Sequence, residues 1–321
     1  MTMTAADIRL RQNPILTALL LGMGQGTMVA EKLFPRLPQV LSSVNLAKLG
    51  DERLRRYNLR RAPGGPTKRV NIKFEGATYS VDQYSVEVPM PRELLREADE
   101  SRKLQVGNYL DVSRIAMTTA SDILGLDYEL EVAALATNVN TYASGHVLAL
   151  AGATKWSAAT GTPVTDVRAA ADTIRKKIGK RPNRLTLSAD AAHALALNPQ
   201  VKSYLPTTVL GPASVEQLKT ILQVEEIVIA DAVWVDETDT GRDVWGNNAI
   251  LAYVPRISAG GGADISLAEP AFGFTNVLEG HPFAETPYYD PGLKSWVYGA
   301  TFERRPNVAY NTAGFLFTNP K

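Results

Sequence analysis

Three side chains that could form a hydrolytic site lie close together in the chain: Ser188, Asp190 and His193. A serine, a base and a carboxylate can perform acyl transfer, but the serine must lie on a strained turn and a separate carboxylate must hold the base. Ser188 and Asp190 are instead typical of residues that cap a helix, and His193 would then lie one turn into that helix. The pattern predicts a helix start and no catalytic residue.

The sequence offers little for a metal ion or a cofactor. It contains no cysteine, which excludes disulfides, thiolate ligands and a cysteine nucleophile. Its three histidines are far apart in the chain: His146, His193 and His281. One loop holds a carboxylate cluster of Asp236, Glu237 and Asp239, but the following Gly241 is not at the spacing of a calcium loop, so a solvated turn is predicted. We expect no cofactor and no metal site.

Composition indicates a folded protein without a global field. The 321 residues are 45% hydrophobic, which is enough for a core, and 34 basic against 33 acidic side chains give a formal charge of +1. A field that attracts nucleic acid or an anionic membrane is therefore excluded, and such binding would need a local patch. One basic patch lies between Asp51 and Lys73, where eight basic residues follow two acidic ones.

Residues 1–45 are predicted to form an arm rather than a domain, because they hold one short apolar segment and no further core. The run Pro14–Met23 is too short to span a bilayer, and the clean small-residue cleavage site of a secretion signal is missing. Glycines at 22, 24 and 26 lack the preceding strand that a phosphate loop needs. We expect an apolar arm that packs on another surface, and no membrane partner.

The segment after the basic patch alternates apolar with polar residues, as strands do. Two runs predict a long hairpin with its turn near Gly76: Val70, Ile72 and Phe74 in the first, and Tyr84, Val86 and Val88 in the second. A two-stranded hairpin is marginal alone in water, and no further strand adjoins it in sequence. We therefore expect it to lie on another surface, which could be another subunit.

From Asp111 to about Val139 the apolar spacing predicts one helix of about 40 Å. The positions expected to be buried follow steps of four and three residues: Val112, Ala116, Thr119, Ile123, Leu126, Leu130, Ala133 and Thr137. Their small Ala and Thr members favour a packed helix over a coiled coil. Such a helix could serve as the spine of a domain.

A helix–strand–helix unit is predicted between Thr165 and Pro206. The first helix has apolar residues at three- and four-residue steps and ends at Gly179, and a short strand around Leu185 and a second helix follow. Helices and strands continue to alternate as far as Val254, which favours a mixed sheet. Beyond the glycines at 260–262 only strands are predicted, at 272–277, 296–302 and 308–317.

This order of parts resembles the major capsid protein of tailed bacteriophages, whose fold is shared with encapsulin nanocompartments. The residues that carry the resemblance are Asn13-Pro14-Ile15-Leu16 with Phe34-Pro35, Arg61-Ala62-Pro63-Gly64-Gly65, Arg181-Pro182-Asn183-Arg184-Leu185 with Asn198-Pro199, and Val244-Trp245-Gly246-Asn247-Asn248 with Leu251-Ala252-Tyr253-Val254. The resemblance implies an α+β capsid fold in five parts. They are an N-terminal arm (1–45), a strand and extended hairpin loop (46–92), a peripheral domain with a spine helix (93–158), an α/β axial domain (159–267) and return strands of the peripheral domain (268–321).

The resemblance also implies a function. Such a protein is no enzyme: it assembles into hexamers and pentamers of an icosahedral head shell that encloses double-stranded DNA, which it contacts non-specifically. Its further partners would be a separate scaffold protein, a portal and a cement protein. The expected location is the virion, after assembly in the host bacterial cytoplasm.

Candidate contacts between subunits come from the hairpin, its basic patch and the acidic run that follows. They are Arg60, Arg61, Lys68, Arg69, Val70, Ile72, Lys73, Phe74, Tyr84, Val86, Glu93, Glu97, Asp99 and Glu100. We expect the basic residues to pair with a neighbour's acidic run and set the register, while apolar contact supplies adhesion. Deletion of Pro66–Val88 should then leave a soluble protein that forms no shells.

Two alternatives remain open from the sequence. An encapsulin-like shell would need a groove for a cargo peptide on its inner wall. A cytoplasmic α/β hydrolase or nucleotide-binding enzyme, centred on Thr165–Val254, would be a monomer or dimer with a pocket. Size-exclusion chromatography would separate that small enzyme from an assembly of many subunits.

Overall fold

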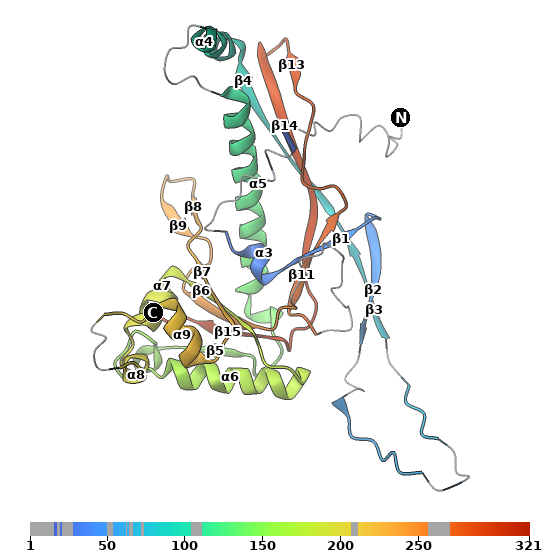
Figure 1. Ribbon diagram of the computed structural model, residues 1–321, viewed down its shortest axis with the longest axis vertical. Helices are drawn as coiled ribbons and strands as arrows, with labels where there is room; N and C mark the ends of the chain where they lie inside the picture. Colours follow the sequence, from blue (N-terminus) through green and yellow to red (C-terminus); the bar gives the residue numbers. More distant parts are fainter. Residues whose placement is uncertain are drawn as a thin grey trace.

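The computed structural model describes residues 16–17, 20, 28–49, 54–61, 63, 67–71, 74–103, 111–206, 211–255 and 270–321, without the side chains of 44–49, 74–78 and 101–102. Within this part of the chain, helices and strands form two sheet layers, with an extended loop to one side (Figure 1). No helix in these ranges is long and apolar enough to cross a membrane.

One long helix packs on a six-stranded sheet in the upper half of Figure 1. The helix, α5, spans Val112–Ala136, and the Asp111 carboxylate caps it by accepting a hydrogen bond from the backbone N–H of Arg114 at 3.1 Å. The strands are β1 (Arg36–Gln39), β4 (Asp82–Pro91), β11 (Gly273–Leu278), β12 (Phe283–Ala284), β13 (Tyr288–Asp290) and β14 (Ser295–Val308). β14 is central, because β4, β11, β12 and β13 all pair with it in antiparallel fashion. The predicted long helix is confirmed.

The face that α5 buries matches the predicted one only in part, because Val112, Ala116 and Ala133 are buried as predicted. The buried side also includes a row at steps of four residues that was not predicted beyond Ala116: Ala120, Leu124, Tyr128 and Val132. Of the expected positions, Thr119 and Ile123 are exposed, the latter at 47%, and Leu126 and Leu130 are only half-buried. The helix carries two apolar stripes, and the small alanines let the first approach β4 and β14 closely. Helical periodicity alone cannot decide which stripe meets the sheet.

The lower layer is a five-stranded sheet with helices around it. In sheet order its strands are β5 (Val147–Ala149), β15 (Gly314–Thr318), β10 (Asn248–Ala252), β6 (Arg184–Ser188) and β7 (Glu226–Ala230). The helices are α6 (Pro163–Ile178), α7 (Ala189–Leu197), α8 (Pro199–Ser203) and α9 (Val215–Leu222), with single turns at Val139–Thr141 (η2) and Gly152–Thr154 (η3). The predicted unit of helix, strand and helix is confirmed, and Gly179 ends α6 in the left-handed conformation with φ of 75°.

Sheet membership does not follow the order of the segments along the chain. β15, which overlaps the predicted strand segment 308–317, and β5, which the sequence did not predict, both pair in the five-stranded sheet. Conversely, β1 of the arm segment and β4 of the hairpin segment both belong to the six-stranded sheet. The chain therefore crosses between the layers more often than a division into consecutive segments allows.

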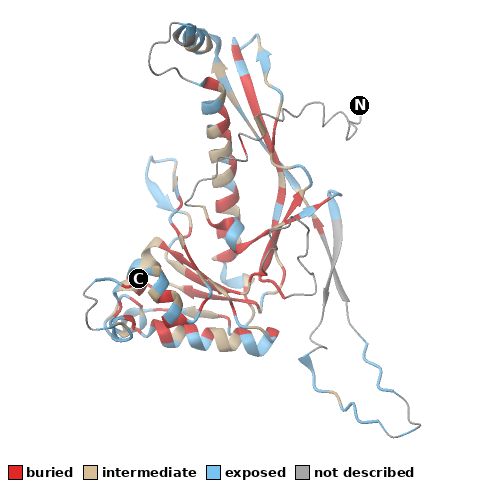
Figure 2. Cartoon of the chain, in the orientation of Figure 1, coloured by how far each residue is buried: buried red, intermediate tan, exposed pale blue. Residues whose placement is uncertain are grey.

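The two larger apolar cores correspond to the two layers, and Figure 2 shows their buried residues along α5, the strands and α6. A third, small cluster consists of Leu37, Tyr79, Phe274 and Ala309. The larger core fills the five-stranded sheet and its helices, and it reaches the C-terminal half of α5. The smaller core lies between the N-terminal half of α5 and the strands β4 and β14. Because α5 contributes to both, it joins the two layers.

The short helix α3 (Ala30–Leu33) attaches the arm segment to the body. Phe34, which follows it, is fully buried, and its ring meets Phe272 edge-on with centroids 5.6 Å apart. Gly273 makes room for this ring, since a Cβ there would lie 2.2 Å from Phe34 Cε1. The end of the arm segment is thus part of the core.

Candidate inter-subunit surfaces

The extended loop starts from a two-stranded ribbon. β2 (Ser43–Leu49) pairs with β3 (Phe74–Ser80) in antiparallel register, Ser43 opposite Ser80 and Leu49 opposite Phe74. The predicted pairing of Val70–Phe74 with Tyr84–Val88, and its turn near Gly76, are wrong. Gly76 lies within β3 opposite Ala47, so the projecting loop is the connection between β2 and β3. The actual partner of β3, β2, lies upstream of the basic patch, about thirty residues away in sequence, so neighbouring alternation does not reveal it.

The basic candidates lie on this loop, at the lower right of Figure 1. Arg60, Arg61, Lys68, Arg69 and Val70 are exposed, as are Arg55 and Arg56 before them. Ile72 and Lys73 lie outside the described residues, and Phe74 is placed in β3 without a described side chain. The described basic residues of the loop present cationic groups to solvent, and the loop projects away from the two large apolar cores (Figure 2).

Tyr84 and Val86, which we predicted to contact another subunit, pack within their own subunit. Both lie on β4, where Tyr84 pairs with Phe302 and Val86 with Ala300 of β14. Val86 borders the smaller core, and the Tyr84 hydroxyl donates to Glu131 Oε1 at 3.2 Å. The ten-residue pairing of β4 with β14 joins segments about two hundred residues apart, which local alternation cannot reveal.

Tyr84 also covers a buried arginine. Arg304 on β14 is fully buried, and its guanidinium lies 4.1 Å from the Tyr84 ring centroid. Arg304 Nη2 approaches Asp127 Oδ2 at 2.6 Å, and Arg304 Nε approaches Glu131 Oε2 at 3.5 Å. This cluster ties β4, β14 and α5 together.

The acidic candidates lie on α4 (Arg92–Lys103), at the top of Figure 1. Glu93, Glu97, Asp99 and Glu100 are all exposed, and Glu93 forms an ion pair with Arg92 at 3.0 Å. The extended loop and α4 are at opposite ends of the molecule. The structure therefore does not bring the two charged groups together within one subunit.

A buried carboxylate that the sequence did not reveal joins three parts of the chain. Glu129 of α5 has no exposed surface, and its oxygens accept hydrogen bonds from Val29 N at 2.9 and 3.0 Å, Ala30 N at 2.8 Å and Trp245 Nε1 at 2.6 Å. Burial raises the pKa of Glu129, and the hydrogen bonds oppose that shift. The donors lie about one hundred residues away on either side, so no local pattern signals this junction.

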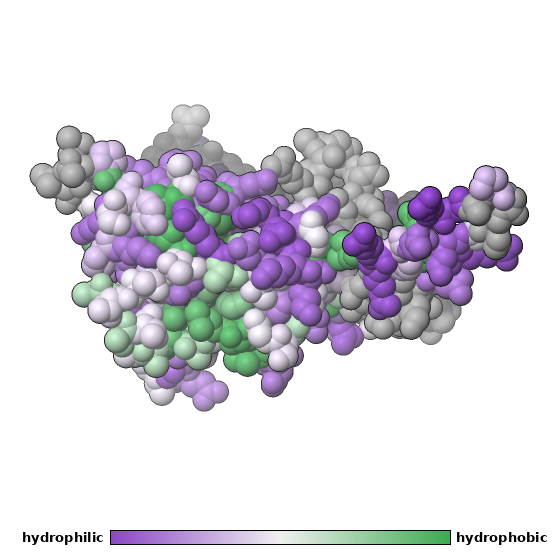
Figure 3. All heavy atoms as spheres, turned by 90° about the horizontal axis from the view of Figure 1, so that it is seen from below, coloured by the Kyte–Doolittle hydropathy of each residue, from purple (hydrophilic) through white to green (hydrophobic). Residues whose placement is uncertain are grey.

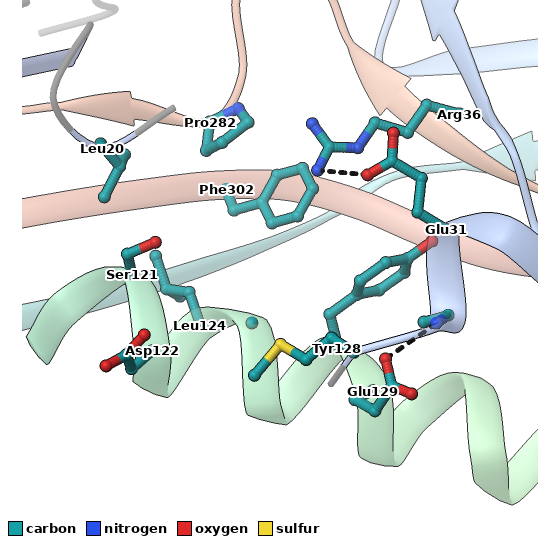
Figure 4. A pocket seen from close by; sticks show the side chains of 13 residues that line it. Leu20, Glu31, Arg36, Ser121, Asp122, Leu124, Tyr128, Glu129, Pro282 and Phe302 are labelled. Carbon is teal, nitrogen blue, oxygen red and sulfur yellow. Dashed lines mark hydrogen bonds and ion pairs between the residues drawn. The ribbon is translucent and has the colours of Figure 1, made fainter. Parts of the chain in front are cut away.

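A cavity of about 380 Å³ opens beside this junction, between α5, α3 and the six-stranded sheet (Figure 4). Tyr128 and Phe302 line it, and Glu31 and Arg36 form an ion pair of 3.1 Å at its edge. Figure 4 shows Ser121, three carboxylates and one arginine in its lining, and no histidine is among the described lining residues that could serve as the base of a serine hydrolase. The cavity lies beside the direct contact that Glu129 makes between α5 and the start of α3.

Of Ser188, Asp190 and His193, only Ser188 has its predicted role: it is buried and caps α7 by accepting from the backbone N–H of Ala191. Asp190, also predicted to cap the helix, lies in its first turn and pairs with Lys321, and His193 is exposed. The cluster at Asp236 forms a turn in which this carboxylate accepts from Thr238, Thr240 and Arg242. Across the described ranges, no group of three or more His, Asp or Glu side chains could hold a metal ion.

Comparisons with known proteins identify relatives along nearly the whole chain. No family model matches. The chain is 31% identical over 307 residues to a protein named major capsid protein from Burkholderia phage BcepMu, which covers 95% of both chains. The crystal structure of a phage-related protein from Bordetella bronchiseptica RB50 is 33% identical, covers 97% of this chain and 98% of that one, and has a TM-score of 0.76. A capsid structure of the cyanophage P-SCSP1u, at 14% identity, covers 91% of this chain and 88% of its own with a TM-score of 0.56, and so supports the fold alone.

Proposed function

Because this chain belongs to the family of tailed-phage major capsid proteins, we infer that it is the subunit from which a phage head shell assembles. The observation that carries this function is the 31% identity over 95% of both chains, since it extends over a whole shell subunit rather than one shared domain. The protein is accordingly structural and not an enzyme, and it forms part of the virion.

The two layers then have distinct places in the shell. We assign the five-stranded sheet and its helices to the axial domain, near the centre of each pentamer or hexamer, and the six-stranded sheet with α5 to the peripheral domain. Residues 1 to about 45 correspond to the arm. Rings of this kind use heterologous contacts, in which two different patches meet repeatedly until rotation closes the ring.

The extended loop between β2 and β3 reaches a neighbouring subunit. What supports this is its shape: a two-stranded ribbon is marginal alone in water, and the described loop residues around it are exposed. A neighbour can stabilise such a loop by burying apolar area, at about 25 cal/mol per Å². Val70, which is 41% exposed, is one described apolar side chain available for this.

The basic loop residues are proposed to pair with the acidic α4 of another subunit. Their separation within one subunit supports a contact between subunits, because the opposite charges meet only when two copies come together. Exposed ion pairs contribute about 0–1 kcal/mol each, so these pairs set the register more than the affinity.

The remaining partners follow from the role of a head shell. We propose that the shell encloses double-stranded DNA, contacted non-specifically, and that a scaffold protein, a portal and a cement protein act with it in the host cytoplasm. A formal charge of +1 supports local rather than global contact with DNA. The encapsulin-like alternative has less support, because the relative at 31% identity is a phage protein.

The decisive experiment shortens the extended loop without touching the sheets. Deletion of Pro66–Val88 would also remove β3 and most of β4, which pairs with β14, and would therefore test folding. Replacing residues 52–71 by Gly-Asn-Gly leaves both paired strands intact. We expect the wild-type protein to form closed particles in negative-stain electron microscopy, and the shortened variant to remain folded by circular dichroism but to form none. Normal particles from the variant would refute the role of the loop.

A further inference from the structure

A second ribbon projects from the five-stranded layer without a partner. β8 (Val233–Val235) and β9 (Gly241–Asp243) pair only with each other in the described part of the chain. Val233 and Val235 point to the same side and are 52% and 62% exposed. Because both valines lie on the same side of a three-residue strand, one face of the ribbon is apolar and uncovered.

The turn of this ribbon is held in one shape. Asp236 Oδ1 accepts from Thr238 N at 2.9 Å, Thr238 Oγ1 at 2.6 Å and Thr240 N at 3.1 Å, and Asp236 Oδ2 accepts from Arg242 Nε at 2.6 Å. These hydrogen bonds, those of Thr238 first, lower the pKa of Asp236 to about 2, so the carboxylate remains ionised at any physiological pH. A preorganised ribbon loses little conformational freedom when it docks.

The ribbon is also strongly acidic. Residues 231–243 contain five acidic residues and one arginine. Asp236 and Arg242 neutralise each other, whereas Asp231, Glu237, Asp239 and Asp243 are exposed. The uncovered apolar face is thus surrounded by negative charge. Electrostatic complementarity therefore favours a basic surface as its binding partner.

A basic surface of the right kind lies on the other side of the same molecule. The last turn of α6 and the residues after it carry Arg175, Lys176, Lys177, Lys180 and Arg181. Asp172 pairs with Arg175 at 3.2 Å and lies 3.8 Å from Arg181, while Lys176 and Lys177 are exposed. Basic residues are stabilised at a helix C-terminus by the helix dipole. Because Asp172 contributes one negative charge against these five basic residues, the helix end keeps an excess of positive charge.

This end of α6 is continuous with the extended loop. A Cβ on Gly179 would lie 2.9 Å from Leu54 Cδ2, so the loop passes directly beside the helix end. Figure 3, seen from below, shows hydrophilic side chains gathered over α6 and again over the loop that projects to the right. The basic flank and the acidic ribbon lie on opposite sides of α5 in Figure 1.

We propose that the β8–β9 ribbon of one subunit docks on the basic C-terminal end of α6 of the next copy of this chain in the ring. The inference rests on the proposed shell function, because a closed ring requires two different patches on opposite sides of one subunit. The apolar face of the ribbon packs against the helix end, and Glu237 and Asp239 face Lys176 and Lys177. The chain has a formal charge of only +1, but its acidic and basic residues are concentrated on separate patches. Two patches of opposite charge suit a heterologous contact between copies.

Engineered cysteines test this contact directly, because the natural chain contains none. Assembled particles of the double variant Asp239→Cys with Lys177→Cys are oxidised gently and run on a denaturing gel without reductant. We expect a ladder of covalent multimers, and none from either single variant. The matched control combines Lys177→Cys with Glu279→Cys, an exposed acidic position outside the ribbon, and should give no ladder.

A charge exchange supplies a second measurement. Lys176→Glu with Lys177→Glu should weaken association about tenfold at low salt, which is the loss of roughly two exposed ion pairs. Adding Glu237→Lys and Asp239→Lys should restore the particle yield. The docking proposal would be overturned if particles form but the double cysteine variant gives no ladder and the charge exchange does not restore the yield. A covalent dimer from Asp239→Cys alone would also overturn it. Neither result would affect the shell function. Absence of wild-type particles would overturn the shell function instead.

Discussion

Replacing Glu129 by alanine removes a fully buried carboxylate on which three backbone or indole N–H groups converge. Val29 and Ala30 would lose the acceptor that holds the start of α3, and Trp245, which is only 2% exposed, would lose the partner of its indole. In the alanine variant these three donors have no protein acceptor. The substitution therefore acts on the joint between the arm segment, α5 and the five-stranded layer (Figure 4).

The magnitude follows from the three donors. Each buried donor left without an acceptor lowers the free energy of unfolding by about 1–3 kcal/mol. Removing the buried carboxylate offsets part of this loss, because the desolvation penalty of its charge is also removed. We expect Glu129→Ala to lower the free energy of unfolding by about 3–5 kcal/mol. For a chain of this size that corresponds to a melting temperature lower by roughly 4–7 °C.

The assay combines thermal unfolding with limited proteolysis of unassembled subunits. Trypsin should cleave after Lys32 and Arg36 faster in the variant, because the segment from Val29 is no longer held. Asp122→Ala is the matched control, since Asp122 lies on the same helix and lines the same cavity but is only half-buried. Equal melting temperatures and equal cleavage rates for the two variants would refute the assigned role of Glu129.

The same residue gives the sign of a pH effect. Burial raises the pKa of Glu129 above its ordinary value of 4.5, so the folded state binds more protons than the unfolded state just above that pH. Its ionisation therefore reduces stability as pH rises through the folded pKa. The difference in melting temperature between wild type and Glu129→Ala should be larger at pH 4.5 than at pH 7, and a difference that grows with pH would contradict this.

Two further substitutions probe the packing that the sequence did not reveal. Arg304→Ala should lower the free energy of unfolding by about 3–5 kcal/mol, measured by urea denaturation, because it leaves Glu131 half-buried without its cation, and an effect below about 1 kcal/mol would show that solvent replaces the pair. Gly273→Ala should cost about 1–3 kcal/mol, since the new methyl group meets the Phe34 ring. The double variant with Phe34→Leu should be less destabilised than the two single effects added, whereas strict additivity would argue against a direct clash.

Several local features were predictable because their causes are local. Asp111 caps α5, Ser188 caps α7 and Gly179 ends α6 through interactions with residues a few positions away. The three-residue and four-residue spacing of α6 likewise matched its buried side. Such features depend on backbone hydrogen bonds and helical periodicity, which a short stretch of sequence specifies.

Features that join distant segments were missed for the opposite reason. The strand expected to return to Val70–Phe74 pairs with β14. On α5, the predicted positions Thr119 and Ile123 are exposed, whereas Ala120 and Leu124 face the sheet. The sequence around Glu129 is typical of an ordinary helix, and its role depends on Val29 and Trp245, which lie about one hundred residues away along the chain. In each case the local sequence is compatible with more than one arrangement. The observed arrangement depends on contacts between segments far apart in sequence.

By itself, the sequence determined that the chain has no cysteine chemistry, where its long helix and its helix–strand–helix unit lie, and, through short motifs in order, which family of shell proteins it resembles. The tertiary structure alone decided which strands form the extended loop, which face of α5 is left uncovered, and that the acidic ribbon and the basic helix end lie on opposite sides. The physical reason is that helix formation is governed by neighbours along the chain, whereas strand pairing and charge placement depend on contacts across it.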